Sequence, residues 1–124
     1  MRSTVTGIRG AALSEQIHAS TVALESAGLQ VRIDGDPVSL SPAQALPAGW
    51  IVRESTTNIL RHARARTVRI TMAPGVVAIE DDGRGARGPA GSGLRGMSER
   101  AAAAGGVLAV EDAPTGGTRV SVTW

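Results

Sequence analysis

Apolar residues follow first a helical and then a strand spacing in the first part of the chain. In residues 13–27 apolar side chains recur near helical spacing, and Gly28 stands where a C-terminal cap belongs. Apolar and polar residues alternate in residues 29–33, which end at the turn-forming residues 34–37. We therefore predict a helix and then a strand, with the polar, glycine-containing residues 1–12 loosely ordered.

A second and longer helix is predicted to begin at Pro42. Ser41 is a favourable N-cap and Pro42 a favourable first helical residue, and apolar residues continue at helical spacing to about Ala65. The sequence Pro47-Ala48-Gly49 interrupts this pattern, so we expect a bend there. This helix is the central one of the chain.

The second half of the chain has strand patterns on both sides of a third helix. Residues 67–72 and 76–81 are joined by Ala73-Pro74-Gly75, which predicts an antiparallel hairpin. A helix is expected over residues 94–104, ended by Gly105-Gly106.

Two further strands are predicted at the C-terminal end, over residues 107–111 and 118–124. The predicted order is therefore αβαββαββ, an α/β class with five strands and three helices. A length of 124 residues and a hydrophobic fraction of 42% suit one domain with its own core.

Glu54, Asn58 and His62 lie four residues apart on the predicted central helix, so they form one polar file. The file borders the side that we expect to face the core, which carries Ile51, Val52, Ile59, Leu60 and Ala63. An Asn58 oxygen can ligate a hard cation such as Mg²⁺, and Glu54 can orient a nucleophile or accept a proton. The residues alone leave open an ordinary solvated face, and for His62 a histidine that bonds the last helix carbonyls.

Two glycine-rich clusters follow, Asp81-Asp82-Gly83-Arg84-Gly85 at the end of an apolar run and Gly91-Ser92-Gly93-Leu94-Arg95-Gly96-Met97 at a helix start. Glycines let the backbone adopt positive φ and approach a ligand closely, and free amides at a helix start can hold phosphate oxygens. The pair points to a bound nucleotide, while a plain tight turn remains an alternative for the first cluster.

Composition narrows the function classes further. The chain has no cysteine, which excludes disulfides and cysteine-ligated metal sites. All 13 basic residues are arginine and the net charge is only +2, so a nucleic-acid partner is weakly supported. Apolar stretches are too short to cross a bilayer. We expect a cytoplasmic domain that itself makes no contact with the membrane and binds no nucleic acid; that it is the cytoplasmic end of a membrane-anchored sensor stays open.

In order, four segments resemble the nucleotide-binding boxes of the histidine-kinase catalytic domain: residues 53–63, 80–85, 91–100 and 116–118. Within that family the chain is similar to sensor kinases related to the nitrate and membrane-fluidity sensors. Arg61-His62-Ala63 and the run Gly93-Leu94-Arg95-Gly96-Met97-Ser98-Glu99-Arg100 single out this subfamily.

The resemblance implies the Bergerat ATP-binding fold, shared with gyrase and MutL. In that fold a mixed, largely antiparallel five-stranded sheet packs on three helices as a two-layer sandwich. It also implies that Asp81 accepts a hydrogen bond from the adenine amino group, supported by Thr118. Gly83 and Gly85 let the backbone pass beside the base and ribose.

The phosphate end of the site follows from the same resemblance. Backbone amides near the helix start cover the phosphates, and the segment supplies Gly91, Gly93, Leu94, Arg95, Gly96 and Met97 to the ATP site. Asn58 is implied to hold Mg²⁺, Arg61 and His62 to donate hydrogen bonds near the phosphates, and Glu54 to be catalytic.

Members of this family transfer the ATP γ-phosphoryl to a histidine on a dimerising helical hairpin. His18 lies only about 40 residues before Asn58, too close to belong to such a hairpin followed by the first strand, so we interpret it as a surface or packing residue. We expect the 124 residues to be the catalytic domain of a longer sensor kinase. Its partners are then that hairpin and, indirectly, a response regulator. We expect a monomer in isolation, because dimerisation resides in the hairpin.

Two other readings remain. A serine kinase of the anti-sigma-factor type shares the fold and the asparagine box, but the Arg61-His62-Ala63 run counts against it. An arginine-rich nucleic-acid-binding module without catalysis predicts steeply salt-dependent nucleic-acid binding and no stabilisation by ATP.

Overall fold

The structure is a computed structural model that describes residues 3–83 and 92–124, without the side chains of residues 3–11, 62–63 and 92–94. The elements in chain order are α1 (Ser3–Ser26), β1 (Gln30–Gly35), the 3-10 helix η1 (Pro37–Ser39), α2 (Pro42–Asn58), the π-helical turn η2 (Ile59–Ala63), β2 (Thr67–Ala73), β3 (Val76–Asp81), α3 (Ser92–Ala103), β4 (Val107–Asp112) and β5 (Thr118–Thr123). The predicted order of helices and strands is confirmed.

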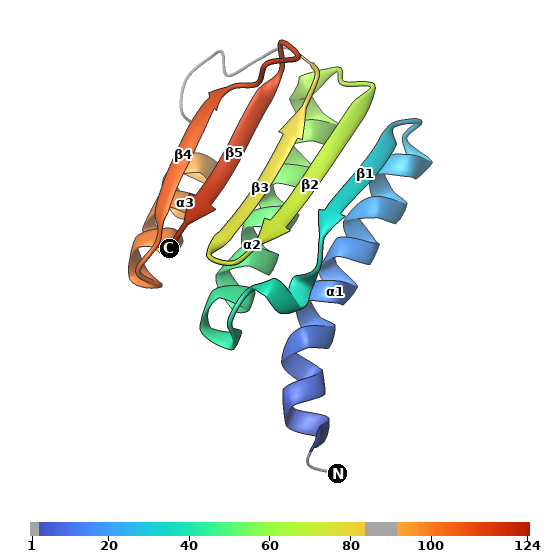
Figure 1. The fold of residues 1–124 in the computed structure, drawn as a ribbon. Coiled ribbons are helices and arrows are strands. Elements are labelled where there is room, and N and C mark those ends of the chain that lie inside the picture. Colours follow the sequence, from blue (N-terminus) through green and yellow to red (C-terminus); the bar gives the residue numbers. More distant parts are fainter. Residues whose placement is uncertain (1–2, 84–91) are drawn as a thin grey trace.

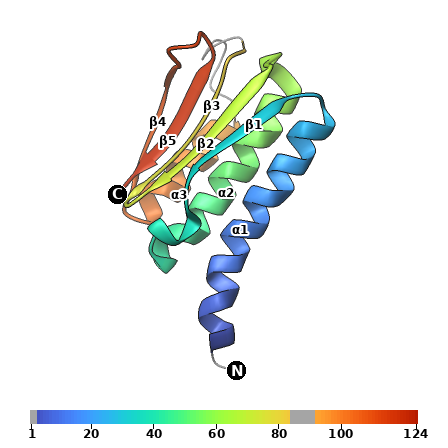
Figure 2. The same ribbon diagram turned by 45° about the vertical axis from the view of Figure 1, so that its right-hand side comes forward.

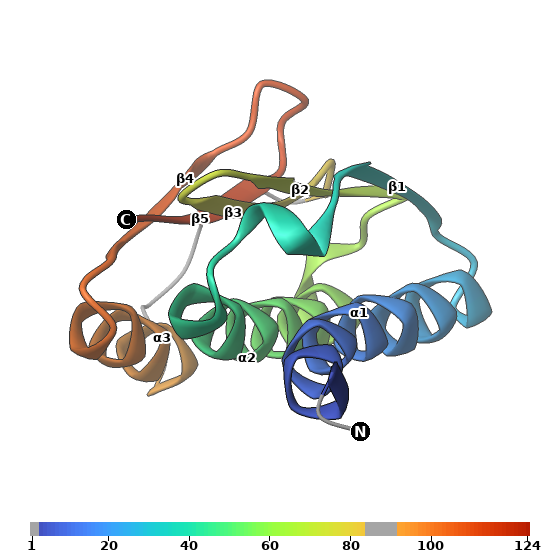
Figure 3. The ribbon, with the colours of Figure 1, turned by 60° about the horizontal axis from the view of Figure 1, so that its bottom comes forward.

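The strands form one sheet in the order β1-β2-β3-β5-β4 (Figure 1). Strand β1 pairs with β2 in parallel, and the other neighbouring strands pair antiparallel. Figure 3 shows that the three α-helices cover one face of this sheet. The two-layer sandwich with a mixed, largely antiparallel sheet is therefore confirmed.

Helix α1 begins at Ser3, well before the predicted start at Leu13, and runs beside α2 (Figure 2). Helix α2 begins where the sequence indicated. Ser41 and Gln44 form a capping box, in which each side chain accepts a hydrogen bond from the other residue's backbone N–H. The helix continues through Pro47.

The core lies between the helices and the sheet. Strand β2 alternates between exposed and buried residues, and Val68, Ile70 and Met72 point inward. Buried residues of β3 and β5 continue this layer, and α2 packs Ile51 and Val52 against the same core. This packing fixes the end of β3 relative to α2.

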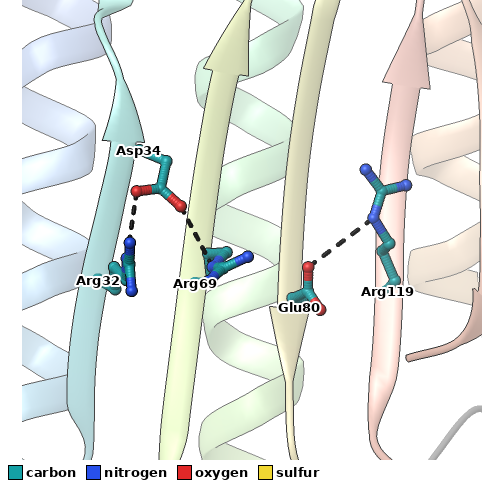
Figure 4. Close-up of polar contacts among 5 residues, drawn as sticks. All are labelled: Arg32, Asp34, Arg69, Glu80 and Arg119. Carbon is teal, nitrogen blue, oxygen red and sulfur yellow. Dashed lines mark hydrogen bonds and ion pairs between the residues drawn. The ribbon is translucent and has the colours of Figure 1, made fainter. Parts of the chain in front are cut away.

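The opposite face of the sheet carries charged side chains. Figure 4 shows Asp34 of β1 between Arg32 and Arg69, with N–O distances of 3.2 Å to each. Arg119 of β5 lies 3.9 Å from Glu80 of β3 (Figure 4). It also lies 3.9 Å from Glu111 of β4. These cross-strand pairs match opposite charges along the outer face.

Candidate functional site

Asp81 is the last residue of β3, and it is buried with only 5% of its surface exposed. Its Oδ1 accepts a hydrogen bond of 2.8 Å from the N–H of Gly83, and the backbone of Thr118 also donates to the carboxylate. Burial raises the pKa of Asp81 above its ordinary value, while these two hydrogen bonds oppose that shift. No basic side chain among the described residues neutralises the carboxylate.

Gly117 lies directly before β5 and approaches Asp81; it belongs to the predicted box 116–118, but the sequence assigned it no role of its own. A Cβ at residue 117 would overlap the main-chain carbonyl of Asp81 and lie 2.6 Å from its Oδ1. Only glycine fits this position without movement of one strand. The signal in the sequence was the pair Gly116-Gly117 directly before Thr118.

Asp82, unlike its neighbour Asp81, bonds to the backbone of the segment before β2. Its Oδ1 accepts hydrogen bonds from the N–H groups of Arg66, at 2.7 Å, and Thr67, at 3.0 Å. The Thr67 bond is the main reason that the pKa of Asp82 lies below its ordinary value. Asp82 thereby joins the turn after β3 to the segment that leads from α2 into β2.

Glu54 and Asn58 lie on α2, and both side chains are half-buried. Neither forms a hydrogen bond or ion pair with another described residue, and the Asn58 side chain caps nothing in the turn that follows. Ile59 on the neighbouring side is buried, but Leu60 is 44% exposed and does not face the core as expected. Leu60 lies in the π-helical turn that begins at Ile59, so the α-helical spacing that assigned it to the buried side does not hold there.

Directly after Asn58 the helix changes to the π-helical turn η2, which ends at Ala63, and the following residue Arg64 has a left-handed φ of 53°. Hydrogen bonds in a π-helix span one residue more than in an α-helix, and such turns occur frequently at functional sites. The predicted file therefore loses its α-helical register between Asn58 and His62. Arg61 is exposed, and the side chain of His62 lies outside the described part.

Helix α3 contacts α2 through Met97. Its side chain is fully buried, and Ser55 Oγ lies 3.9 Å from its sulfur. A direct contact of the Met97 side chain with a ligand therefore requires α3 to move. Arg95 on the same helix is exposed, and Gly96 is half-buried.

Figure 1 shows that the end of α2, the end of β3 and the start of β5 lie at the same end of the molecule. Asn58, Asp81 and Thr118 are the terminal residues of these elements, so they lie at that same end, as does Gly83, two residues after β3. Gly93 and Leu94 belong to the first turn of α3, while Gly85 and Gly91 lie outside the described residues. Among the described residues, no three His, Asp or Glu side chains cluster in a way that could hold a metal ion.

The known proteins that the chain resembles are histidine kinases or domains of them. The chain is 38% identical over 111 residues to the signal transduction histidine-protein kinase/phosphatase UhpB of Salmonella typhimurium. The matched region covers 81% of this chain and 21% of UhpB. The chain is 26% identical to the histidine kinase domain of the blue-light activated histidine kinase from Erythrobacter litoralis, with a TM-score of 0.72, covering 92% of this chain and 63% of that one. No protein-family profile matches the chain.

The ATP-binding domain of PrrB from Mycobacterium tuberculosis shares the fold, with a TM-score of 0.63 at 20% identity over 90% of this chain and 89% of that one. The fold and the relatives define an ATP-binding catalytic domain of a histidine kinase. The chain belongs to the sensor histidine kinases of two-component signal transduction, and its likeness to UhpB agrees with the subfamily indicated by the sequence. The chain spans about a fifth of the length of UhpB, 21%. No helix in the described ranges has both the length and the hydrophobicity needed to cross a membrane.

Proposed function

We propose that the chain binds Mg-ATP and supplies the γ-phosphoryl group to a histidine on a separate helical hairpin of the same kinase. The observation that carries this proposal is the buried carboxylate of Asp81, which has backbone partners and no neutralising cation among the described residues. Keeping such a group buried is costly, so a ligand that donates a hydrogen bond to it explains its place.

The base end of the site consists of Asp81, Gly83, Gly85 and Thr118. In the proposal the adenine amino group donates to the Asp81 carboxylate, whose orientation is fixed by the N–H groups of Gly83 and Thr118. The backbone of Gly117 packs directly against the main chain of Asp81, because a Cβ at residue 117 would overlap the Asp81 carbonyl. This close packing favours one geometry of the base.

Asn58 carries the metal in this proposal. Its amide oxygen is a hard ligand with no partner among the described residues, and Mg²⁺ is usually held by few protein groups together with substrate phosphates. The lack of an acidic cluster in the described residues agrees with that mode of binding. Bound Mg²⁺ supplies charge neutralisation on the phosphate oxygens.

Other residues hold the phosphates and assist the transfer. Arg61 and His62 donate toward the phosphates from η2, while Gly93 and Leu94 direct backbone amides at them from the first turn of α3. Gly91 keeps the phosphate-binding role that the family resemblance implies, although it lies outside the described residues. Arg95 and Gly96 extend this segment, and buried Met97 docks it onto α2. Glu54 orients the acceptor imidazole and takes its proton as the N–P bond forms and the bond to the leaving ADP oxygen breaks.

The proposed partners are the dimerisation and phosphoacceptor hairpin and, through it, a response regulator. We propose a cytoplasmic location, supported by the fact that one structure of the same fold is the cytoplasmic segment of the kinase QseC. The 124 residues on their own are proposed to be a monomer that turns over slowly, because phosphoryl transfer depends on how the acceptor histidine is positioned.

A thermal-shift titration with ADP and ATP tests the function. We expect the melting temperature to rise with either nucleotide, and to rise more in the presence of Mg²⁺, because a ligand that binds the folded state stabilises it by mass action. GTP serves as the control for the base. No shift with ADP or ATP at millimolar concentration contradicts the proposal, and a shift with nucleic acid alone favours the arginine-rich module.

A further inference from the structure

Trp50 lies on α2 one turn before Glu54, and its indole ring faces α3. The guanidinium carbon of Arg100 is 4.1 Å from the centre of that ring, which is the geometry of a cation–π contact. On the same side of α3, a Cβ at Gly96 would lie 3.4 Å from Cη2 of Trp50. The indole therefore fits against α3 at two points one helical turn apart.

A second contact between the helices lies further along α2, at Ser55 and Met97. Together the two contacts fix both the distance and the rotation of α3 relative to the helix that carries Glu54 and Asn58. Because Met97 and Ala101 are fully buried, the α3 side of the interface is also anchored in the core. Trp50 lies outside the four predicted boxes, and Arg100, the last residue of the box 91–100, has no ligand role in the proposal above.

We propose that Trp50 is a positioning residue, which through Arg100 and Gly96 holds the first turn of α3 at the distance from Asn58 that the nucleotide phosphates require. This role rests on the proposed function. It follows from the fold, since the base end of the site is built on β3 and β5, whereas the phosphate end depends on how α3 docks on α2. Loss of the contact therefore weakens binding of the phosphates and leaves binding of the base unchanged.

The test compares ADP with adenosine, which lacks the phosphates. Removing an exposed cation–π contact corresponds to a change of about two- to fivefold in an equilibrium constant. We expect Arg100→Gln to raise the Kd for ADP by about that factor while the Kd for adenosine stays constant. Arg100→Lys keeps a cation over the ring and restores part of the loss. Glu99→Gln, at the exposed neighbouring position, is the matched control and leaves both constants unchanged.

Trp50→Leu removes the ring and the contact at Gly96 together, so the loss in ADP affinity exceeds that of Arg100→Gln. Far-ultraviolet circular dichroism shows whether this variant folds, and Arg100→Gln serves where it does not, because Arg100 is exposed. Without ligand, Arg100→Gln also changes the tryptophan emission spectrum, since the cation leaves the Trp50 ring.

The outcomes separate the two proposals. A folded variant with unchanged ADP affinity overturns the positioning role, and so does an equal loss for ADP and adenosine, which indicates general damage to the fold. A parent protein that binds neither ligand overturns the proposed function and this role with it.

Discussion

Gly117 packs so closely against the backbone of Asp81 that no side chain fits at residue 117. A Cβ at residue 117 would overlap the Asp81 carbonyl and lie 2.6 Å from the carboxylate oxygen Oδ1. The same oxygen accepts the N–H of Gly83. The position of the buried carboxylate is thus set by two glycines that lie far apart in the sequence.

Gly117→Ala is therefore expected to push β5 away from the end of β3. We predict a loss of about 1–3 kcal/mol in the free energy of unfolding, typical of overpacking, together with weaker ADP binding to the folded protein. Gly116→Ala is the matched control. It meets no neighbouring atom but strains a φ of +101°, so it lowers stability without displacing Asp81. Chemical denaturation and calorimetry measure the two effects, and equal ADP affinity in all three proteins contradicts the prediction.

Asp81→Asn tests the base end of the site. An amide carries one acceptor oxygen and adds an NH₂ donor, so it cannot present two acceptors to Gly83, Thr118 and an adenine amino group. We predict that Asp81→Asn selectively loses its affinity for adenine nucleotides, which calorimetry measures. In the parent, ADP binding should weaken as the pH falls through the raised pKa of Asp81, at a higher pH than an ordinary aspartate requires. A variant that binds ADP like the parent rules out the adenine contact.

Asp82 is expected to make folding sensitive to acid. Its pKa in the folded state lies below the ordinary value of 3.8, so the ionised group stabilises the protein above that pH. This contribution is lost as the pH falls through the folded-state pKa. We predict that Asp82→Asn is less stable by about 1 kcal/mol at pH 7, because two charge-assisted hydrogen bonds become neutral ones.

Denaturation from pH 7 to pH 2 checks this prediction. The stability difference between parent and Asp82→Asn should shrink steadily below about pH 4. Asp81 acts with the opposite sign, since its raised pKa favours folding at low pH, but it is present in both proteins and largely cancels. A difference that stays constant across the range excludes the role given to Asp82.

The sequence was most informative where local chemistry decides the structure. Ser41, Gln44 and Pro42 determine a helix start within a few residues, and Pro74-Gly75 determines a hairpin turn. The start of α1 was missed because the polar and glycine residues before Leu13 weaken the apolar pattern that marks a helix face. The π-helical turn after Asn58 has no recognised signal in the sequence.

The candidate site was predictable only in part, for a related reason. The resemblance selected Asn58, Asp81 and Thr118, but the contacts that hold them involve residues distant in sequence. Gly117 against Asp81 and Arg100 over Trp50 depend on strand pairing and helix docking. Even the bonds from Arg66 and Thr67 to Asp82 require the β2 and β3 hairpin to be formed. The ligand roles of the site residues stay predictions.

Asn58→Ala tests the proposed metal ligand. The side chain is half-buried and bonded to no other described residue, so its removal should change stability little. We predict loss of the Mg²⁺-dependent part of ADP binding, measured as the ratio of Kd with and without Mg²⁺. Thr57→Ala, at the preceding helix position, is the control. A ratio equal to that of the parent eliminates Asn58 as the ligand.

Glu54→Gln separates catalysis from binding. The substitution keeps the size and polarity of a half-buried side chain without described partners, so nucleotide affinity should remain that of the parent. Because glutamine cannot accept the proton of the attacking imidazole, phosphorylation of an added acceptor hairpin should slow by about a hundredfold or more. Single-turnover transfer from saturating Mg-ATP measures this step directly. Arg53→Gln, exposed on the preceding position of α2, controls for a general change at the helix surface. Equal transfer rates for Glu54→Gln and the parent disprove the catalytic role, whereas a parallel loss of nucleotide affinity reassigns Glu54 to the binding of Mg-ATP.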